Sequence, residues 1–167
     1  MNKPNPTGSF FVPHDIEAPI AGSASGPLAG LTAVVKDMYD IAGSRTGGGN
    51  PDWLAAQQPA TRHAAAVEQI LAAGATITGK TICDEFFYSG SGISSHYGTP
   101  VNVRAPGRIP GGSSSGSAAA TVSPSSSTAP TRRITPGALA KNPPTSKEGA
   151  IAMAPARSMR PCVGRKP

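Results

Sequence analysis

The chain has 167 residues, enough for one ordinary domain, and a formal net charge of +6. The charge is uneven: residues 1–120 carry 7 Lys and Arg against 8 Asp and Glu, whereas residues 121–167 carry 8 against 1. Cys83 and Cys162 are too few for a disulfide framework, and no Cys/His cluster indicates a metal or another cofactor. No apolar run approaches membrane-spanning length and the first residues lack a signal-peptide core, so we expect a cytoplasmic protein.

The N-terminal residues show little periodicity, and we predict a mobile arm over residues 1–26. Within it, 10–12 (FFV) is either a strand that docks on the domain or merely a sticky terminus. A buried strand is predicted over 31–36 (LTAVVK), because this run is rich in β-formers. The glycine-rich residues 42–51 follow as a loop.

Helix and strand then alternate along the chain. Thr61 is a candidate N-cap for a helix over 62–73, with Gly74 where a terminating glycine belongs. Residues 75–78 (ATIT) predict a second strand, and 84–89 a short helix whose first acids favour the dipole. This order predicts an α/β domain with parallel strand pairing over residues 27–120.

The C-terminal residues 121–167 have no aromatic side chain and 8 of the 18 prolines. Such a segment buries too little apolar surface to offset the entropy of ordering, so we predict a disordered basic tail. Its cations could bind nucleic acid or other polyanions in a salt-dependent, non-specific way. It lacks aromatics for base stacking, and we favour a solvated end without a function.

Residues 74–81 (GATITGKT) match the phosphate-loop pattern G-x-x-x-x-G-K-[ST]. That motif requires a strand before it and a helix directly after it. Here the first glycine ends a predicted helix, and the supposed loop is rich in β-formers. We therefore favour a helix–turn–strand connection in which Lys80 is exposed.

Residues 111–120 (GGSSSGSAAA) permit several interpretations. The run contains G-x-S-x-G, but an α/β-hydrolase triad needs a later histidine, and none follows His96. Gly111 and Gly112 allow close backbone approach, and a small-residue helix from Ser113 would gather hydroxyls and N–H groups at one point. A flexible Ser/Gly linker is the equally open alternative.

Lys36, at the end of the first predicted strand, is also ambiguous by itself. It can extend its amine to solvent, or it can be buried, lose its proton and act as a base. The sequence around it and around the glycine–serine run is more specific. Residues 30–37 (GLTAVVKD) with 40–43 (DIAG), and 97–102 (YGTPVN) with 110–118 (PGGSSSGSA), resemble the catalytic-lysine strand and the first-serine segment of the amidase signature family.

The resemblance covers about residues 26–120 and implies a partial amidase-signature fold, a mixed sheet flanked by helices. A narrower resemblance, to plant-type indole-3-acetamide amidohydrolases, is carried by 49–54 (GNPDWL) and 95–100 (SHYGTP). In the family, a lysine is the base for a serine held by a cis peptide bond, which relays a proton for a nucleophilic serine. The resemblance implies that Lys36 is the base, Ser113 the bridging serine and Ser114 a supporting group, without any cofactor.

The sequence departs from the family after Ala120. The family continues to a G-T-D-T-G-G-S-like turn, about two dozen residues past the bridging serine, that supplies the nucleophile and oxyanion-hole amides. No Gly-Gly-Ser occurs in 121–167, and the abrupt change in composition suggests a shifted reading frame or an altered exon. The resemblance thus implies an amidase for a small carboxylic amide, with this chain lacking the nucleophile and inactive. The alternative is a non-catalytic fragment or an interaction protein.

Overall fold

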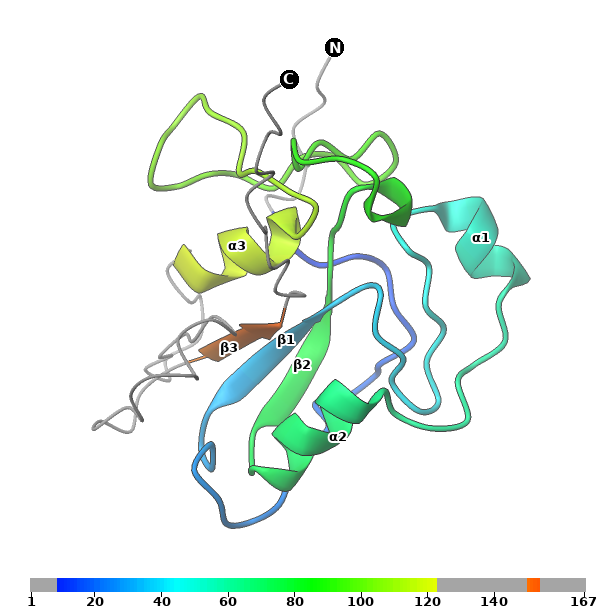
Figure 1. The fold of residues 1–167 in the computed structure, drawn as a ribbon, viewed down its shortest axis with the longest axis vertical. Coiled ribbons are helices and arrows are strands. Elements are labelled where there is room, and N and C mark those ends of the chain that lie inside the picture. The colour runs from blue at the N-terminus through cyan, green and yellow to red at the C-terminus, as the bar shows by residue number, and fades with distance from the viewer. Residues whose placement is uncertain (1–8, 123–149, 154–167) are drawn as a thin grey trace, which may run out of the picture.

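The computed structural model describes residues 9–122 and 150–153. Its centre is a parallel sheet of three strands in the order β2-β1-β3 (Figure 1). The strands are β1 (Thr32–Lys36), β2 (Thr76–Thr81) and β3 (Ala150–Met153), and the helical elements are α1 (Pro51–Ala56), α2 (Ala65–Ala72), the 3₁₀ turn η1 (Glu85–Phe87) and α3 (Ser115–Val122). The predicted α/β class is confirmed.

Strand β1 has two different faces because successive side chains of a strand alternate in direction. Ala33 and Val35 are fully buried in the main core, which α2 closes with Val67. Val34 belongs to a second apolar cluster on the other face, with Ala120 of α3. Lys36 lies two residues after Val34, so the strand directs this lysine to the face that α3 covers.

Helix α2 is shorter than the helix predicted over 62–73. Its N-cap is Ala64, which makes no side-chain hydrogen bond, so the predicted capping by Thr61 is wrong. The predicted end is confirmed, because Gly74 has a φ of 99°, a conformation that glycine adopts without strain. The side chain of Val67 anchors the helix on the sheet.

Two helical elements differ from the predicted loop and helix. Helix α1 begins at Pro51, inside the expected loop 42–51, because the Asn50 side chain accepts a hydrogen bond from the Trp53 N–H at 2.8 Å. The helix predicted over 84–89 is only the single turn η1. Phe86 and Phe87 have φ values of 43° and 64°, in the left-handed region that does not continue a helix.

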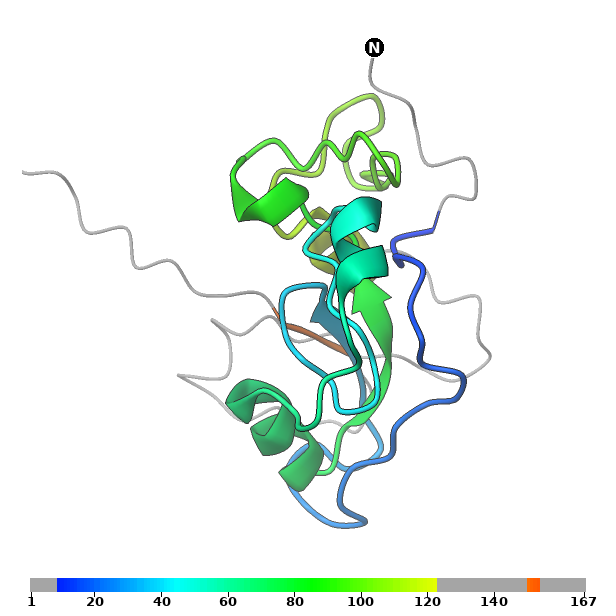
Figure 2. The same ribbon diagram turned by 90° about the vertical axis from the view of Figure 1, so that its right-hand side faces the viewer.

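Residues 9–20 run along the outer edge of β2. Phe11 and Thr81, and Ile20 and Ile77, form antiparallel bridges at this edge. Figure 2 shows the segment on the opposite side of β2 from α2. The docking interpretation of residues 10–12 agrees with this pairing, and the mobility predicted for residues 1–26 stays a prediction.

Most of the predicted tail 121–167 lies outside the described residues. The described parts are the end of α3 and strand β3, which pairs with β1 from Thr32–Ala150 to Val35–Met153. The composition of the tail does not predict this strand. Within the described residues, no helix has the length and apolar character needed to cross a membrane.

Candidate active site

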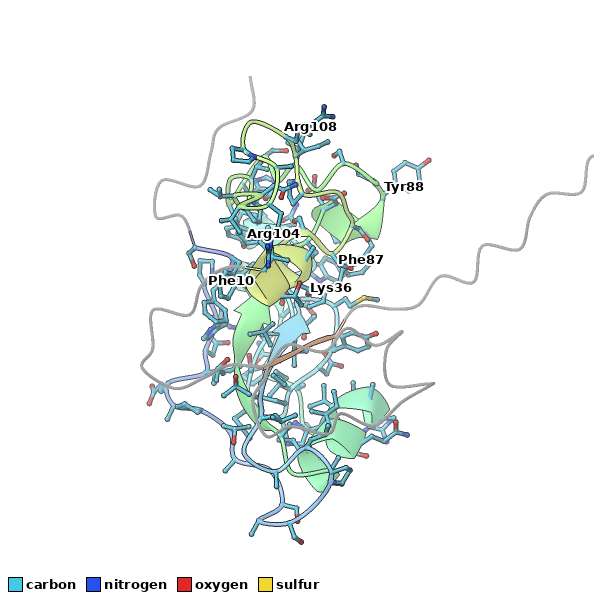
Figure 3. The ribbon with its side chains drawn as sticks, turned by 90° about the vertical axis from the view of Figure 1, so that its left-hand side faces the viewer. Phe10, Lys36, Phe87, Tyr88, Arg104 and Arg108 are labelled. Atoms are coloured by element: carbon cyan, nitrogen blue, oxygen red, sulfur yellow. The ribbon has the colours of Figure 1, made fainter. Side chains whose placement is uncertain are left out.

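Lys36 and Ser113 lie together at the carboxyl end of β1. The Lys36 Nζ donates a hydrogen bond to the Ser113 Oγ at 2.7 Å, and Lys36 is fully buried. Figure 3 shows Lys36 at the tip of the strand beside α3, with Phe87 next to it. The centroid of the Phe87 ring is 5.1 Å from Nζ. The structure therefore brings together the two residues that the sequence proposed as base and bridging serine.

The segment that carries Ser113 is fixed by its backbone. The Gly112 N–H donates to the Gly90 carbonyl at 2.9 Å, and the Asp84 N–H donates to the Ser113 carbonyl at 3.1 Å. The peptide bond between Gly112 and Ser113 is cis, and Gly111 has a φ of 78°. A Cβ at Gly112 would overlap Asp84 Oδ2, so glycine is required at this close approach.

Helix α3 begins directly after this segment, two residues later than predicted. Its first turns pack on the end of β2: the Gly116 N–H donates to the Ile82 carbonyl at 2.9 Å, and the hydroxyls of Thr81 and Ser117 lie 2.8 Å apart. The flexible-linker interpretation of this run is therefore wrong. Ser114, expected to support the site, directly precedes α3, and its carbonyl accepts a hydrogen bond from the Ala118 N–H.

The environment of Lys36 makes its amine easier to deprotonate than an exposed lysine. Burial lowers the pKa of Lys36, while the nearby Cys83 and then Asp84 act to raise it. Burial also raises the pKa of the Cys83 thiol to about 12, so this thiol is uncharged near pH 7. A neutral amine in contact with a hydroxyl can accept its proton, which is the chemistry of a general base.

A second buried lysine, Lys80, lies behind the site and contradicts its predicted exposure. Its amine forms an ion pair with Asp37 at 3.1 Å and donates to the Arg45 carbonyl and the Thr46 hydroxyl. Asp37 also accepts the Gly47 N–H at 3.2 Å. Strand β2 turns Lys80 inward, where a buried carboxylate compensates its charge. The predicted strand in place of a phosphate loop is confirmed.

Three residues around the lysine were not predicted from the sequence: Asp37, Asp84 and Phe87. Asp84 was interpreted only as an acid near a helix start, whereas its side chain is buried beside Ser113. The signal that could have identified it is its position directly after β2, since neighbouring parallel strands end at the same edge. Among residues 9–122 and 150–153, no three His, Cys, Asp or Glu side chains are grouped as metal ligands.

Residues 14–129 match the family model described as Amidase. The chain is 58% identical to Amidase 1 of Oryza sativa subsp. japonica over 94 residues, which are 56% of this chain and 22% of the relative. It is 48% identical to Amidase 1 of Arabidopsis thaliana over 116 residues, 70% of this chain and 27% of the relative. The chain thus spans about a quarter of the length of these curated relatives.

Solved structures agree with this comparison. A chain from a vestigial complex linked to the origins of an s-triazine catabolic enzyme aligns with a TM-score of 0.55 and 41% identity, over 59% of this chain and 21% of the other. The allophanate hydrolase of Kluyveromyces lactis aligns with a TM-score of 0.52 and 36% identity, over 57% of this chain and 15% of the hydrolase. The partial fold predicted from the resemblance is confirmed.

The comparisons correct the expected cytoplasmic location. Relatives with 46% and 43% identity, over 61% and 58% of this chain, are the chloroplastic and mitochondrial outer envelope proteins 64 of Arabidopsis thaliana. The translocon at the outer membrane of chloroplasts 64 of Pisum sativum is 43% identical over 58% of this chain. These relatives are named for organellar outer membranes, so the lack of a membrane-spanning apolar run and of a signal-peptide core does not establish a cytoplasmic location.

Proposed function

The chain belongs to the amidase family, and we propose that Lys36 and Ser113 are the proton-transfer part of a Ser-Ser-Lys site for amide hydrolysis. The observation that supports this most is the 2.7 Å hydrogen bond between the buried Lys36 amine and the Ser113 hydroxyl. Relatives named Amidase 1 support a carboxylic amide as the substrate class. Within that class, we propose indole-3-acetamide, on the sequence resemblance alone.

The proposed chemistry moves one proton along the pair and back. A nucleophilic serine attacks the amide carbonyl while its proton passes to Ser113, whose own proton passes to the neutral Lys36 amine. The proton then returns along the same path to the departing ammonia or amine. Water hydrolyses the acyl-enzyme and releases the acid. Lys36 is suited to this role because burial lowers its pKa.

We also propose that this chain does not complete the reaction. Residues 121–167 contain no Gly-Gly-Ser turn that could supply the nucleophile and the oxyanion-hole amides. Losing even one such amide donor typically lowers kcat by about 10²–10³-fold. Ser114 cannot take over the role, because a substitute nucleophile would lack the relay that activates the true one.

Ammonia release by the purified chain tests the proposed inactivity. The assay compares indole-3-acetamide and simple aliphatic amides as substrates for the chain and for its Lys36→Ala variant. We expect the two proteins to be indistinguishable. Turnover by the unsubstituted chain well above that of the variant would show that a substitute nucleophile exists.

A chimera tests the role of the pair itself. Residues 1–120 are fused to the part of Arabidopsis Amidase 1 that follows its matched segment. We expect the chimera to release ammonia, and Lys36→Ala or Ser113→Ala to lower kcat by about 10²–10⁴-fold, the usual contribution of general acid–base catalysis. Ser114→Ala serves as the matched control. Unchanged kcat in the Lys36 and Ser113 variants of an active chimera would refute the proposed roles.

In place of the cytoplasm, we propose association with the outer envelope of chloroplasts or mitochondria, as the names of three relatives suggest. The test is expression of the tagged chain in Arabidopsis protoplasts followed by fractionation. We expect the chain to sediment with organelles and to be digested by protease added outside them. Recovery of the chain only in the soluble fraction would contradict this location.

A further inference from the structure

Asp84 occupies the junction where the Ser113 segment meets the turn after β2. Its backbone N–H donates to the Ser113 carbonyl at 3.1 Å, and its Oδ2 accepts the Gly92 N–H at 3.1 Å. A Cβ on Gly112 would overlap this same Oδ2. A single residue therefore connects the turn after β2, the loop around Gly92 and the segment that presents Ser113.

Only one oxygen of this carboxylate is used in that structural contact. Asp84 is 1% exposed, and its Oδ1 has no hydrogen-bond partner among the described residues. A buried carboxylate oxygen without a partner costs free energy that a purely structural residue would avoid. An Asn could accept the Gly92 N–H equally well without a charge. The contact with Gly92 therefore does not explain why a carboxylate, and not an amide, occupies this position.

A candidate for the group on which this negative charge acts is the amine of Lys36, because it bonds to Ser113, whose carbonyl accepts the Asp84 N–H. Cys83 and Asp84, from the turn after β2, act electrostatically on Lys36, and the Lys36 amine contacts Ser113 before α3 and the ring of Phe87. Cys83 is a neutral thiol near pH 7 because burial raises its pKa to about 12. The adjacent carboxylate of Asp37 is paired with Lys80. Asp84 thus supplies the negative charge that no cation within the described residues pairs with.

We propose that Asp84 is a positioning residue for the Lys36–Ser113 pair: it holds the Ser113 segment in place, and its carboxylate supplies the counter-charge when Lys36 carries a proton. The inference rests on the proposed function in assigning that proton to catalysis. The carboxylate acts through space, since the Lys36 amine bonds to Ser113. Burial and the carboxylate oppose each other on the pKa of Lys36, so their balance sets how readily the amine takes up and returns the proton.

The test is a pH titration of the Lys36 amine in the full 167-residue chain. Selective ¹³C labelling of lysine allows the Cε resonance to be followed by NMR, and Lys36→Met assigns the signal. Asp84→Asn keeps an acceptor for Gly92 and removes the charge, so we expect a lower titration midpoint for Lys36. Glu85→Gln, which removes the carboxylate of the exposed neighbouring residue, should leave the midpoint unchanged. Equal midpoints in the unsubstituted and Asp84→Asn chains would overturn the counter-charge role.

Two further measurements separate positioning from folding and from activity. Hydrogen exchange should show that the Gly92 amide is protected in the unsubstituted and Asp84→Asn chains but not in Asp84→Ala. An unprotected Gly92 amide in the unsubstituted chain would refute the positioning contact between Asp84 and Gly92. If Asp84→Asn does not fold, ¹³C labelling of aspartate in the unsubstituted chain replaces it. The Asp84 Cγ resonance should then inflect at the Lys36 midpoint, and a flat response refutes the coupling. None of these measurements requires catalytic turnover. They can therefore support or refute the role of Asp84 even if the chimera is inactive and the proposed function fails.

Discussion

The amine of Lys36 and the hydroxyl of Ser113 are 77 positions apart in the chain and 2.7 Å apart in space. Strand β1 ends at the lysine, and α3 begins two residues after the serine. The contact therefore depends on how α3 packs on the ends of β1 and β2. Its consequences for stability can be measured separately from any catalysis.

The buried amine makes the free energy of unfolding depend on pH. Burial lowers the pKa of Lys36 from its usual 10.5. Between the lowered pKa and 10.5, the unfolded chain binds a proton on this amine that the folded chain does not, so stability rises with pH in that window. Urea unfolding at a series of pH values should show a smaller rise in Lys36→Met than in the unsubstituted chain.

The control for that series is Arg62→Met, which removes an exposed positive charge. The comparison stays below about pH 9, because Cys83 contributes with the opposite sign above its usual pKa of 9.0. The same slope in Lys36→Met and in the unsubstituted chain would mean that the folded lysine titrates normally.

Removing the hydroxyl of Ser113 should destabilise the fold. In Ser113→Ala the buried Lys36 amine loses its acceptor, and leaving a buried polar group without a partner costs about 1–3 kcal/mol. Ser114→Ala, one residue further, removes a hydroxyl from a residue that bonds through its carbonyl, and should change stability by less than about 0.5 kcal/mol. Urea unfolding followed by circular dichroism measures both; equal losses would contradict the assignment of the contact to Ser113.

The ion pair of Lys80 and Asp37 should show strong coupling in a double-mutant cycle. Lys80→Met leaves the Asp37 carboxylate buried without its counter-ion, which costs about 3–5 kcal/mol for a buried pair. Asp37→Asn in the Lys80→Met background removes that charge, so the double variant should lose less stability than the sum of the two single variants. Additive losses would show that the pair contributes no coupling.

The close approach at Gly112 should reject a methyl group. In Gly112→Ala the Cβ would overlap Asp84 Oδ2 and lie 2.6 Å from the Gly92 backbone nitrogen, so the Ser113 segment must shift. The matched control is Gly90→Ala, since a Cβ at Gly90 meets nothing within 4 Å. We expect Gly112→Ala to lower the unfolding midpoint and change the Lys36 Cε resonance. An unchanged resonance would show that the pair tolerates the shift.

The residues that could be predicted from the sequence are those whose signal is local or carried by the family resemblance. The β-branched run before Lys36 predicts β1, and the resemblance pairs this lysine with Ser113. Helix α1 was missed because the loop glycines outweighed the Asn50 cap and Pro51, although both are start signals. Thr61 is a residue type that commonly caps helices, but α2 begins later, at Ala65, where the buried Val67 can pack on the sheet.

Buried charges were the least predictable part of the site. Lys80 has the sequence context of a surface lysine in a strand, and only the loop that wraps Asp37 makes a buried position tolerable for its charge. The place of Asp84 is decided by the loop around Gly92 and by the absence of a side chain on Gly112. Such contacts join segments that are distant in the sequence, so they cannot be predicted from a local pattern of residue types.

The antiparallel bridges of Phe11 and Ile20 along β2 also bear on how the chain behaves at high concentration. An open strand edge is a template for pairing with other molecules, and aggregation commonly starts there. The Val12 N–H donates to the Lys80 carbonyl at 3.0 Å and the Ile20 N–H to the Ile77 carbonyl at 2.8 Å, so backbone groups on this edge are already occupied. By pairing with this edge, the N-terminal segment prevents another chain from adding a strand to β2. Proteolytic loss of residues 9–20 would expose the unpaired edge of β2 and should promote aggregation.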